Sequence, residues 1–172
     1  TLFRSLVNDV LELSRIESGN MSFHCEDCSA HHFAETVYQT HQVIILPPVE
    51  FIKEFPDEDV TIHIDRMRLT QVITNFLGNA KKFTSQGHIK LGYFCDKEKK
   101  EIHIFVEDTG AGIPKEELQM IFERFYKRNE FVQGVGLGLA ISKVIVEKMN
   151  GHIDVQSEVN KGSRFTAVLP YL

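Results

Sequence analysis

The sequence predicts a two-layer α/β (α+β) sandwich, in which a mixed, mostly antiparallel sheet of about five strands carries helices on one face. Three observations lead to this fold class. The 172 residues, 42% hydrophobic and 25% charged, have the composition of a globular chain with one main core. Helical and strand patterns interleave along the chain. Two pairs of strands have short connections typical of hairpins, which favours a mixed sheet over a doubly wound parallel one.

Helical and strand patterns can be followed through the first half of the chain. Apolar residues repeat every three or four positions over 2–16, which predicts an amphipathic helix, and a Ser-Gly-Asn sequence ends it. A short strand is predicted over 21–25. A helix over 29–45 follows, and two successive prolines end it. The stretches 49–55 and 60–64 are predicted strands joined by an acidic turn, as in a hairpin.

The second half begins with Asp65, the expected N-cap of a helix that runs to about Lys82. Strongly alternating stretches over 89–95 and 101–107 predict a hairpin with a charged connection. The remaining expected elements are a helical segment from Pro114 to about Phe125, a polar stretch to Gln133, an apolar helix to Met149 that Gly151 ends, and strands over 153–158 and 164–169.

Charge, hydropathy and cysteine content exclude several classes of function. The net charge is -5 and the basic residues are scattered, so the broad cationic surface that nucleic acid requires is not expected. No apolar run approaches the roughly 20 residues that span a bilayer. Three cysteines do not fit the disulfide framework of a small secreted protein and suit a reducing compartment. We therefore expect a soluble domain.

The helix after Asp65 carries a first group of candidate site residues, Asn75, Asn79 and Lys82. Their spacings of four and three residues place them on one helix face. Two amide oxygens and an ammonium group on one face suit a metal ion and a chain of phosphates. The alternative interpretation is a pair of asparagines on a solvated helix face.

A second candidate is the sequence Asp-Thr-Gly-Ala-Gly-Ile-Pro at 108–114, which follows a predicted strand. The strand delivers Asp108 to its end, and Gly110 and Gly112 permit backbone conformations that allow the close approach of a flat ligand. An ionised aspartate only accepts hydrogen bonds, which suits an exocyclic amine such as that of adenine. The alternative is a tight turn with a purely structural role.

A third candidate is the glycine-rich segment with Gly134, Gly136 and Gly138 at the start of the last helix. Exposed backbone N–H groups and the helix dipole favour phosphates there. The spacing differs from that of the dinucleotide fingerprint, and the Gly-Lys-Ser or Gly-Lys-Thr of a P-loop is missing.

Taken in order with Phe-Glu-Arg-Phe-Tyr-Lys at 122–127, these motifs resemble the N, G1, F and G2 boxes of the histidine-kinase branch of the GHKL ATP-binding family. The resemblance covers nearly the whole chain and implies a Bergerat ATP-binding fold. It implies that 1–20 is the C-terminal part of the second dimerisation-domain helix, and that 21–172 is the ATP-binding catalytic domain.

The resemblance also implies roles for individual residues. Asn79 would hold Mg2+, with Asn75 close to it as a second candidate ligand, and Lys82 would approach the phosphates of ATP. Asp108 would accept a hydrogen bond from adenine, and Phe83 would lie against the purine, although it could equally be a core residue. The other implied cofactor-binding positions are Gly110, Gly112, Ile113, Phe122, Phe125, Gly134, Gly136, Leu137 and Gly138, with Arg124, Lys127 and Arg128 as further phosphate contacts.

The implied activity is that of a protein-histidine kinase of a two-component signalling system. The γ-phosphoryl of Mg-ATP would pass to a histidine outside this chain, because none of the eight histidines lies in a His-Glu or His-Asp pair on an early helix. The implied partners are the protein's own dimerisation and phosphoacceptor domain and the receiver domain of a response regulator. We expect a cytoplasmic domain that is monomeric by itself, within a homodimeric parent that can be anchored in the inner membrane.

Four alternatives remain open at the level of sequence. A hydrolytic GHKL ATPase would carry a glutamate one helical turn before the metal-binding asparagine, where this chain has Asn75, and an amide cannot act as a general base. A serine kinase of the anti-sigma-factor type and a non-catalytic binding module share the fold. A zinc site could use Cys25, Cys28, His31 and His32, although their spacing is crowded.

Overall fold

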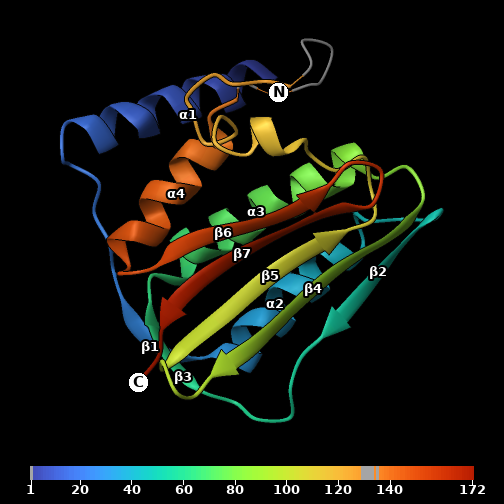
Figure 1. The fold of residues 1–172 in the computed structure, drawn as a ribbon. Helices are drawn as coiled ribbons and strands as arrows, with labels where there is room; N and C mark the ends of the chain where they lie inside the picture. The colour runs from blue at the N-terminus through green and yellow to red at the C-terminus, as the bar shows by residue number, and fades with distance from the viewer. Residues whose placement is uncertain (1, 129–133, 135) are drawn as a thin grey trace.

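The computed structural model describes residues 2–128, 134 and 136–172 (Figure 1). Its helices are α1 (Leu2–Glu17), α2 (Ala30–Gln42), α3 (Arg66–Phe83) and α4 (Gly138–Lys148), with one 3-10 helix, η1 (Lys115–Glu117). Its strands are β1 (Glu26–Ser29), β2 (Val49–Glu54), β3 (Thr61–Ile64), β4 (Gly87–Asp96), β5 (Glu101–Asp108), β6 (His152–Glu158) and β7 (Gly162–Pro170). The polar stretch predicted up to Gln133 lies largely outside the described residues.

The predicted fold class is confirmed. A five-stranded sheet has the order β2-β4-β5-β7-β6, in which only the β2–β4 pair is parallel. The helices α2, α3 and α4 lie on one side of this sheet, and α1 lies outside them (Figure 1). A small second sheet pairs β1 with β3.

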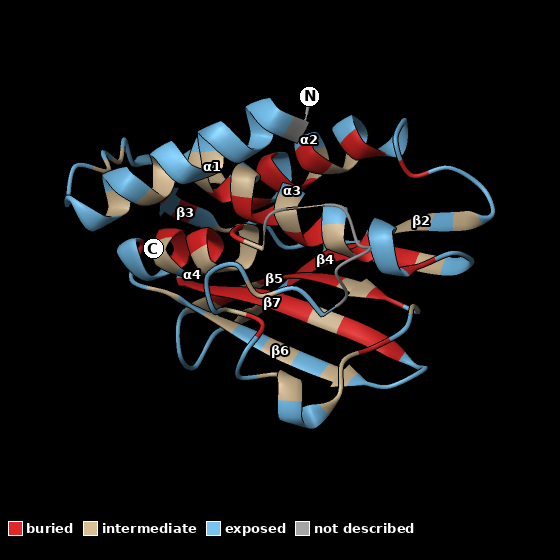
Figure 2. Ribbon diagram, turned by 90° about the horizontal axis from the view of Figure 1, so that it is seen from above, coloured by how far each residue is buried: buried red, intermediate tan, exposed pale blue. Residues whose placement is uncertain are grey.

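Hydrophobic burial explains why the two layers hold together. Alternate residues of β5, including Ile102, Ile104 and Val106, are buried, and α3 packs Phe76 and Leu77 onto the same core. Each such side chain stabilises the fold by about 1.5–3 kcal/mol when it is removed from water. Figure 2 shows buried residues along the inner strands and helix faces, whereas most of α1 is exposed. None of the helices described is both long and apolar enough to cross a membrane.

The predicted start of α3 is also confirmed. Asp65 caps this helix by accepting a hydrogen bond from the backbone N–H of Arg68 at 3.1 Å. Its second oxygen accepts the N–H of His24 at 2.9 Å, so the same carboxylate ties down the segment after α1. A cap of this kind stabilises by about 0.5–2 kcal/mol. It fixes the register of the helix that carries the first group of site residues.

The strand predicted over 21–25 is wrong, because the strand lies at Glu26–Ser29 instead. Met21 and Phe23 do pack against the core, which produces the alternation in the sequence, but they lie in irregular backbone. Phe23 lies under the guanidinium group of Arg68, 5.9 Å from its ring centroid. Alternating burial of side chains thus produced a strand-like pattern in a segment that pairs with no neighbouring strand among the described residues.

The hairpin predicted between 49–55 and 60–64 is also wrong. β2 pairs in parallel with β4 after a crossover through α3, and β3 pairs with β1. The acidic turn serves another purpose: Asp59 accepts hydrogen bonds from Ser29 Oγ and from the N–H of His31, at the start of α2. The hairpins in the sheet are β4–β5, as predicted, and β6–β7.

Two helix ends differ from the prediction. The helix expected from Pro114 to Phe125 is reduced to η1 and turns, because Phe125 has φ 62° and its N–H donates to Gly136 O at 2.8 Å. At the end of α4 the left-handed residue is Asn150 rather than Gly151, with Gly151 N–H bonded to Val146 O at 3.0 Å. Gly151 is needed for space, since a Cβ there would lie 2.1 Å from Val168 O.

Candidate functional site

A cavity of about 270 Å³ lies between α3, β5, the start of α4 and β7, with α1 along one side. Ten of the predicted site residues line it, namely Asn75, Asn79, Lys82, Phe83, Asp108, Gly112, Ile113, Gly134, Gly136 and Gly138. Three segments that are far apart in the sequence therefore meet at one cavity. Lys127 and Arg128 line it as well.

The helix α3 presents Asn75, Asn79 and Lys82 to the cavity from one face. Asn75 is held in place, because its Nδ2 donates to Ser142 Oγ of α4 at 3.2 Å. A Cβ at Gly138 would lie 2.2 Å from Asn75 Oδ1. The missing side chain of Gly138 thus allows α3 and α4 to approach each other at the edge of the cavity.

Lys82 makes this side of the cavity positive. Burial, and then the charge of Lys127, lower the pKa of the Lys82 ammonium group. A Cβ built at Gly134 would lie 2.9 Å from Lys82 Nζ, so the ammonium group reaches the glycine-rich segment. Two neighbouring cations and a glycine-rich backbone form an environment that favours a phosphate group.

Asp108 provides a buried carboxylate at the end of β5, where its side chain is close to the cavity wall. Burial raises its pKa, while the N–H groups of Gly110 and Ser163 act in the opposite direction. The Gly110 N–H donates to Asp108 Oδ1 at 2.8 Å. The turn therefore fixes the orientation of the carboxylate, as expected for a group that must accept one particular hydrogen bond.

The glycines after Asp108 make room for protein backbone. A Cβ at Gly110 would lie 2.3 Å from Phe83 O, at the end of α3. Gly112 has φ 67°, and a Cβ there would lie 2.0 Å from Glu158 O. The two interpretations of this segment are therefore compatible: Gly110 and Gly112 belong to a tight turn that positions Asp108, and Gly112 also lines the cavity.

Five predicted residues do not line the cavity: Gly110, Phe122, Arg124, Phe125 and Leu137. Arg124, predicted as a phosphate contact, instead pairs with Glu17 of α1. Leu137 is fully buried in the core, and Phe122 packs against the core from the surface. Phe125 is 59% exposed and is bonded through its backbone to Gly136. These residues support the segments that form the wall.

Several residues of the wall were not predicted from the sequence, including Ser5 and Asp9 of α1 and Ser163 and Phe165 of β7. Ser163 pairs directly with Asp108 in the sheet, but it precedes the strand predicted over 164–169, so the strand pattern did not indicate it. Asp9 is a polar residue three positions after Leu6, on the apolar stripe of α1, so the sequence indicates that it faces inward but not that it meets the cavity.

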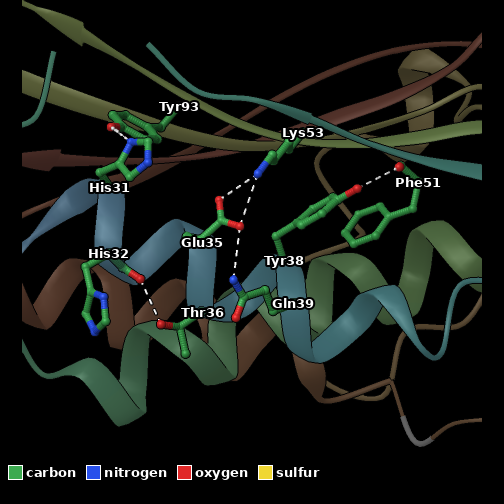
Figure 3. A network of polar contacts seen from close by, with 9 residues as sticks. All are labelled: His31, His32, Glu35, Thr36, Tyr38, Gln39, Phe51, Lys53 and Tyr93. Atoms are coloured by element: carbon green, nitrogen blue, oxygen red, sulfur yellow. Dashed lines mark hydrogen bonds and ion pairs between the residues drawn. The ribbon is translucent and has the colours of Figure 1, made fainter. Parts of the chain in front are cut away.

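The structure gives no support to a zinc site. His31 Nδ1 lies 3.4 Å from the hydroxyl of Tyr93, and His32 points away from His31 (Figure 3). Within the described residues, one group of three potential ligands lies close enough together to hold a metal, and it contains none of the four predicted residues. That group is Asp96, Glu101 and His103.

The fold and the cavity define the class of protein, an ATP-binding catalytic domain of the Bergerat type. Residues 64–172 match the family described as Histidine kinase-, DNA gyrase B-, and HSP90-like ATPase. The chain belongs to this family, and within it corresponds to the ATP-binding catalytic domains of sensor histidine kinases.

Relatives and a solved structure agree with this assignment. The chain is 36% identical to the sensor histidine kinase WalK of Bacillus subtilis over 171 residues, covering 96% of this chain and 28% of WalK. It is 35% identical to the sensor histidine kinase RcsC of Salmonella typhimurium over 176 residues, covering 99% of this chain and 18% of RcsC. The crystal structure of full-length ShkA in complex with AMPPNP matches with a TM-score of 0.87 and 29% identity, covering 97% of this chain and 35% of that one. The chain thus spans less than a third of WalK and RcsC.

Proposed function

We propose that this domain binds Mg-ATP in the cavity and presents the γ-phosphoryl group to a histidine on another domain of a sensor kinase. The observation that carries the proposal is the polarity of one cavity, with the buried Asp108 carboxylate toward one end and the Lys82 ammonium group toward the other. A second hollow adjoins the cavity. Asn79 and Lys82 line both hollows, whereas Asp108 lines the cavity only, so Asp108 lies at a different end of the cavity from Asn79 and Lys82. ATP has the complementary arrangement, an amine donor at one end and an anionic chain at the other.

Each end supplies one part of the recognition of ATP. Asp108 would accept the adenine amino group, since an ionised aspartate has acceptors only. Lys82, with Lys127 and the backbone of Gly134 and Gly136, would lie along the phosphates. Such groups position and neutralise the transferred group, which is most of what phosphoryl transfer requires from a protein.

The amide side chains fit a magnesium ion. Mg2+ prefers oxygen ligands and is usually held by a few protein groups together with substrate phosphates. Asn79 lines both hollows and offers an amide oxygen. The Nδ2 of Asn75 is bonded to Ser142, so we propose that Asn75 positions the helices and that Asn79 is the ligand. When bound, the ion would neutralise charge on the terminal phosphates.

Transfer is favoured over hydrolysis by the residue one turn before Asn79. Asn75 occupies this position, and an amide cannot take a proton from water at neutral pH. The phosphoacceptor histidine, the dimerisation domain and the response regulator would be supplied outside this chain. The helix α1 favours an interaction with a dimerisation domain, because three of its apolar residues are exposed. The exposed fractions of Phe3, Val10 and Leu11 are 75%, 43% and 53%. We propose that 1–20 is the end of a dimerisation helix.

Calorimetry with ATP and GTP tests the assignment of Asp108 and Lys82. Asp108→Asn should lower the affinity for Mg-ATP at least tenfold and reduce the preference for ATP over GTP, because an amide can donate to the guanine carbonyl. Lys82→Gln should weaken ATP binding and leave adenosine binding unchanged. The control is Asp154→Asn, an exposed residue that lines neither hollow. Unchanged ATP affinity and base preference in Asp108→Asn would refute the proposed orientation.

A further inference from the structure

Asp9 brings a carboxylate from α1 to the wall of the proposed nucleotide site. It lines both the main cavity and the adjoining hollow, as do Asn79 and Lys82. Asp108 lines the main cavity only. Asp9 therefore lies at the end of the site where the metal and the phosphates would bind, and away from the adenine end.

Ion pairs and hydrogen bonds hold α1 in this position. Glu12, three residues after Asp9, pairs with Arg68 of α3 and accepts the Gln71 amide at 2.5 Å. The side chains of Arg68 and Glu12 are only 19% and 15% exposed. Residues three apart share a helix face, so this contact directs Asp9 toward α3 as well. A second pair, Glu17 with Arg124, attaches the end of α1 to the segment after η1.

The charge of Asp9 has no partner within the described part of the chain, where its side chain makes neither a hydrogen bond nor an ion pair. Burial, and then the charge of Glu12, raise the pKa of Asp9. A partly buried carboxylate without a partner destabilises the protein unless a cation comes close to it. The structure thus places an unpaired negative charge where a cation would be bound.

The chemistry of magnesium identifies that cation. Mg2+ in nucleotide sites is usually bound through one or two carboxylates plus phosphates. Among the described residues that line the main cavity, the carboxylates are Asp9 and Asp108, and Asp108 lies at the other end. A carboxylate close to the metal is attracted by it, whereas without the metal the carboxylate and the triphosphate only repel each other.

We propose that Asp9 makes nucleotide binding depend on Mg2+, by contacting the metal of the bound nucleotide directly or through one of its waters. This inference rests on the proposed function. It makes α1 a part of the nucleotide site. The occupancy of the site and the docking of α1 are then linked, since each favours the other to the same extent.

The test compares the dissociation constants of AMPPNP with Mg2+ and with EDTA, for the unchanged chain, Asp9→Asn, Asp9→Glu and the control Asp154→Asn. The ratio of the two constants measures the metal dependence. We expect Asp9→Asn to reduce this ratio about tenfold, as is typical when a supporting carboxylate of a metal site is removed. Asp9→Glu should retain a larger ratio than Asp9→Asn, and Asp154→Asn should leave it unchanged.

The failure of this inference differs from a failure of the proposed function. If Asp9→Asn binds the nucleotide with an unchanged ratio, the inference is overturned while the nucleotide site stands. If the unchanged chain binds no nucleotide under either condition, the proposed function fails. A purely structural role of Asp9 would weaken binding equally with and without Mg2+, and that result would also overturn the inference.

Discussion

The Asn75 side-chain amide donates to Ser142 Oγ at 3.2 Å, and this hydrogen bond joins α3 to α4 beside the cavity. Ser142 is buried and Gly138 lies against Asn75 Oδ1, so the contact leaves no room for a larger residue. This polar pair thus joins the helix that carries the proposed metal ligand to the helix that follows the glycine-rich segment.

The contact between Asn75 and Gly138 should appear as non-additivity in a double-mutant cycle. Asn75→Ala leaves the buried Ser142 hydroxyl without its partner and should lower the free energy of unfolding by about 1–2 kcal/mol. Gly138→Ala introduces a methyl group against Asn75 and should cost about 1–3 kcal/mol. The loss in the free energy of unfolding of the double variant should be smaller than the sum of the two single losses by more than about 0.5 kcal/mol, because removing the amide relieves the clash. Urea unfolding measures all three values, and additive losses would contradict the contact.

Replacing either of two glycines with alanine should change the stability of the fold, in opposite directions at the two positions. Gly162 has φ 114°, and a Cβ there would lie 1.8 Å from Asp108 O, so Gly162→Ala should destabilise by more than about 2 kcal/mol. Gly78 lies on the exposed side of α3 with no atom within 4 Å of a built Cβ. Gly78→Ala should stabilise by about 0.5–1 kcal/mol through helix propensity. Thermal unfolding of both variants checks the contrast, and a destabilised Gly78→Ala would show that its surroundings are tighter than described.

Local patterns predicted the parts of the fold that are stabilised by regular periodicity. The alternation of Ile89, Leu91 and Tyr93 and the helix capped by Asp65 were correct because their burial is periodic and local. The helix expected up to Phe125 failed because the N–H of that residue bonds to Gly136, a contact that its own sequence window does not contain.

The same distinction applies to the site. The residues of α3, Asp108 and the glycine-rich segment belong to short motifs, so they could be selected as site candidates from their spacing. Asp9 could not be placed at the cavity, because its position depends on the docking of α1 through Glu12 and Arg68. That contact joins residues 56 positions apart, beyond the reach of any local pattern.

The start of α2 should lose stability in acid through Asp59. Burial acts to raise the pKa of Asp59, but hydrogen bonds from Ser29 Oγ and the His31 N–H outweigh it and hold the pKa below its ordinary value. A carboxyl group whose pKa is lower in the folded state stabilises the fold above its unfolded pKa of about 3.9, and this stabilisation is lost as the pH falls through the folded value. Asp59→Asn should therefore be less stable than the unchanged chain at pH 7, and the difference should shrink below about pH 4.

Unfolding in urea between pH 7 and pH 3 measures this difference. The matched control is Asp57→Asn, an exposed residue in the same acidic turn that makes no hydrogen bond among the described residues. It should show little difference from the unchanged chain at either pH, because its charge supports no contact in the folded state. A difference in the free energy of unfolding between Asp59→Asn and the unchanged chain that stayed constant down to pH 3 would contradict this prediction. The ionised Asp59 carboxylate would then not anchor the start of α2. The hydroxyl of Ser29, which accepts the His32 N–H at 2.9 Å, would account for the cap by itself.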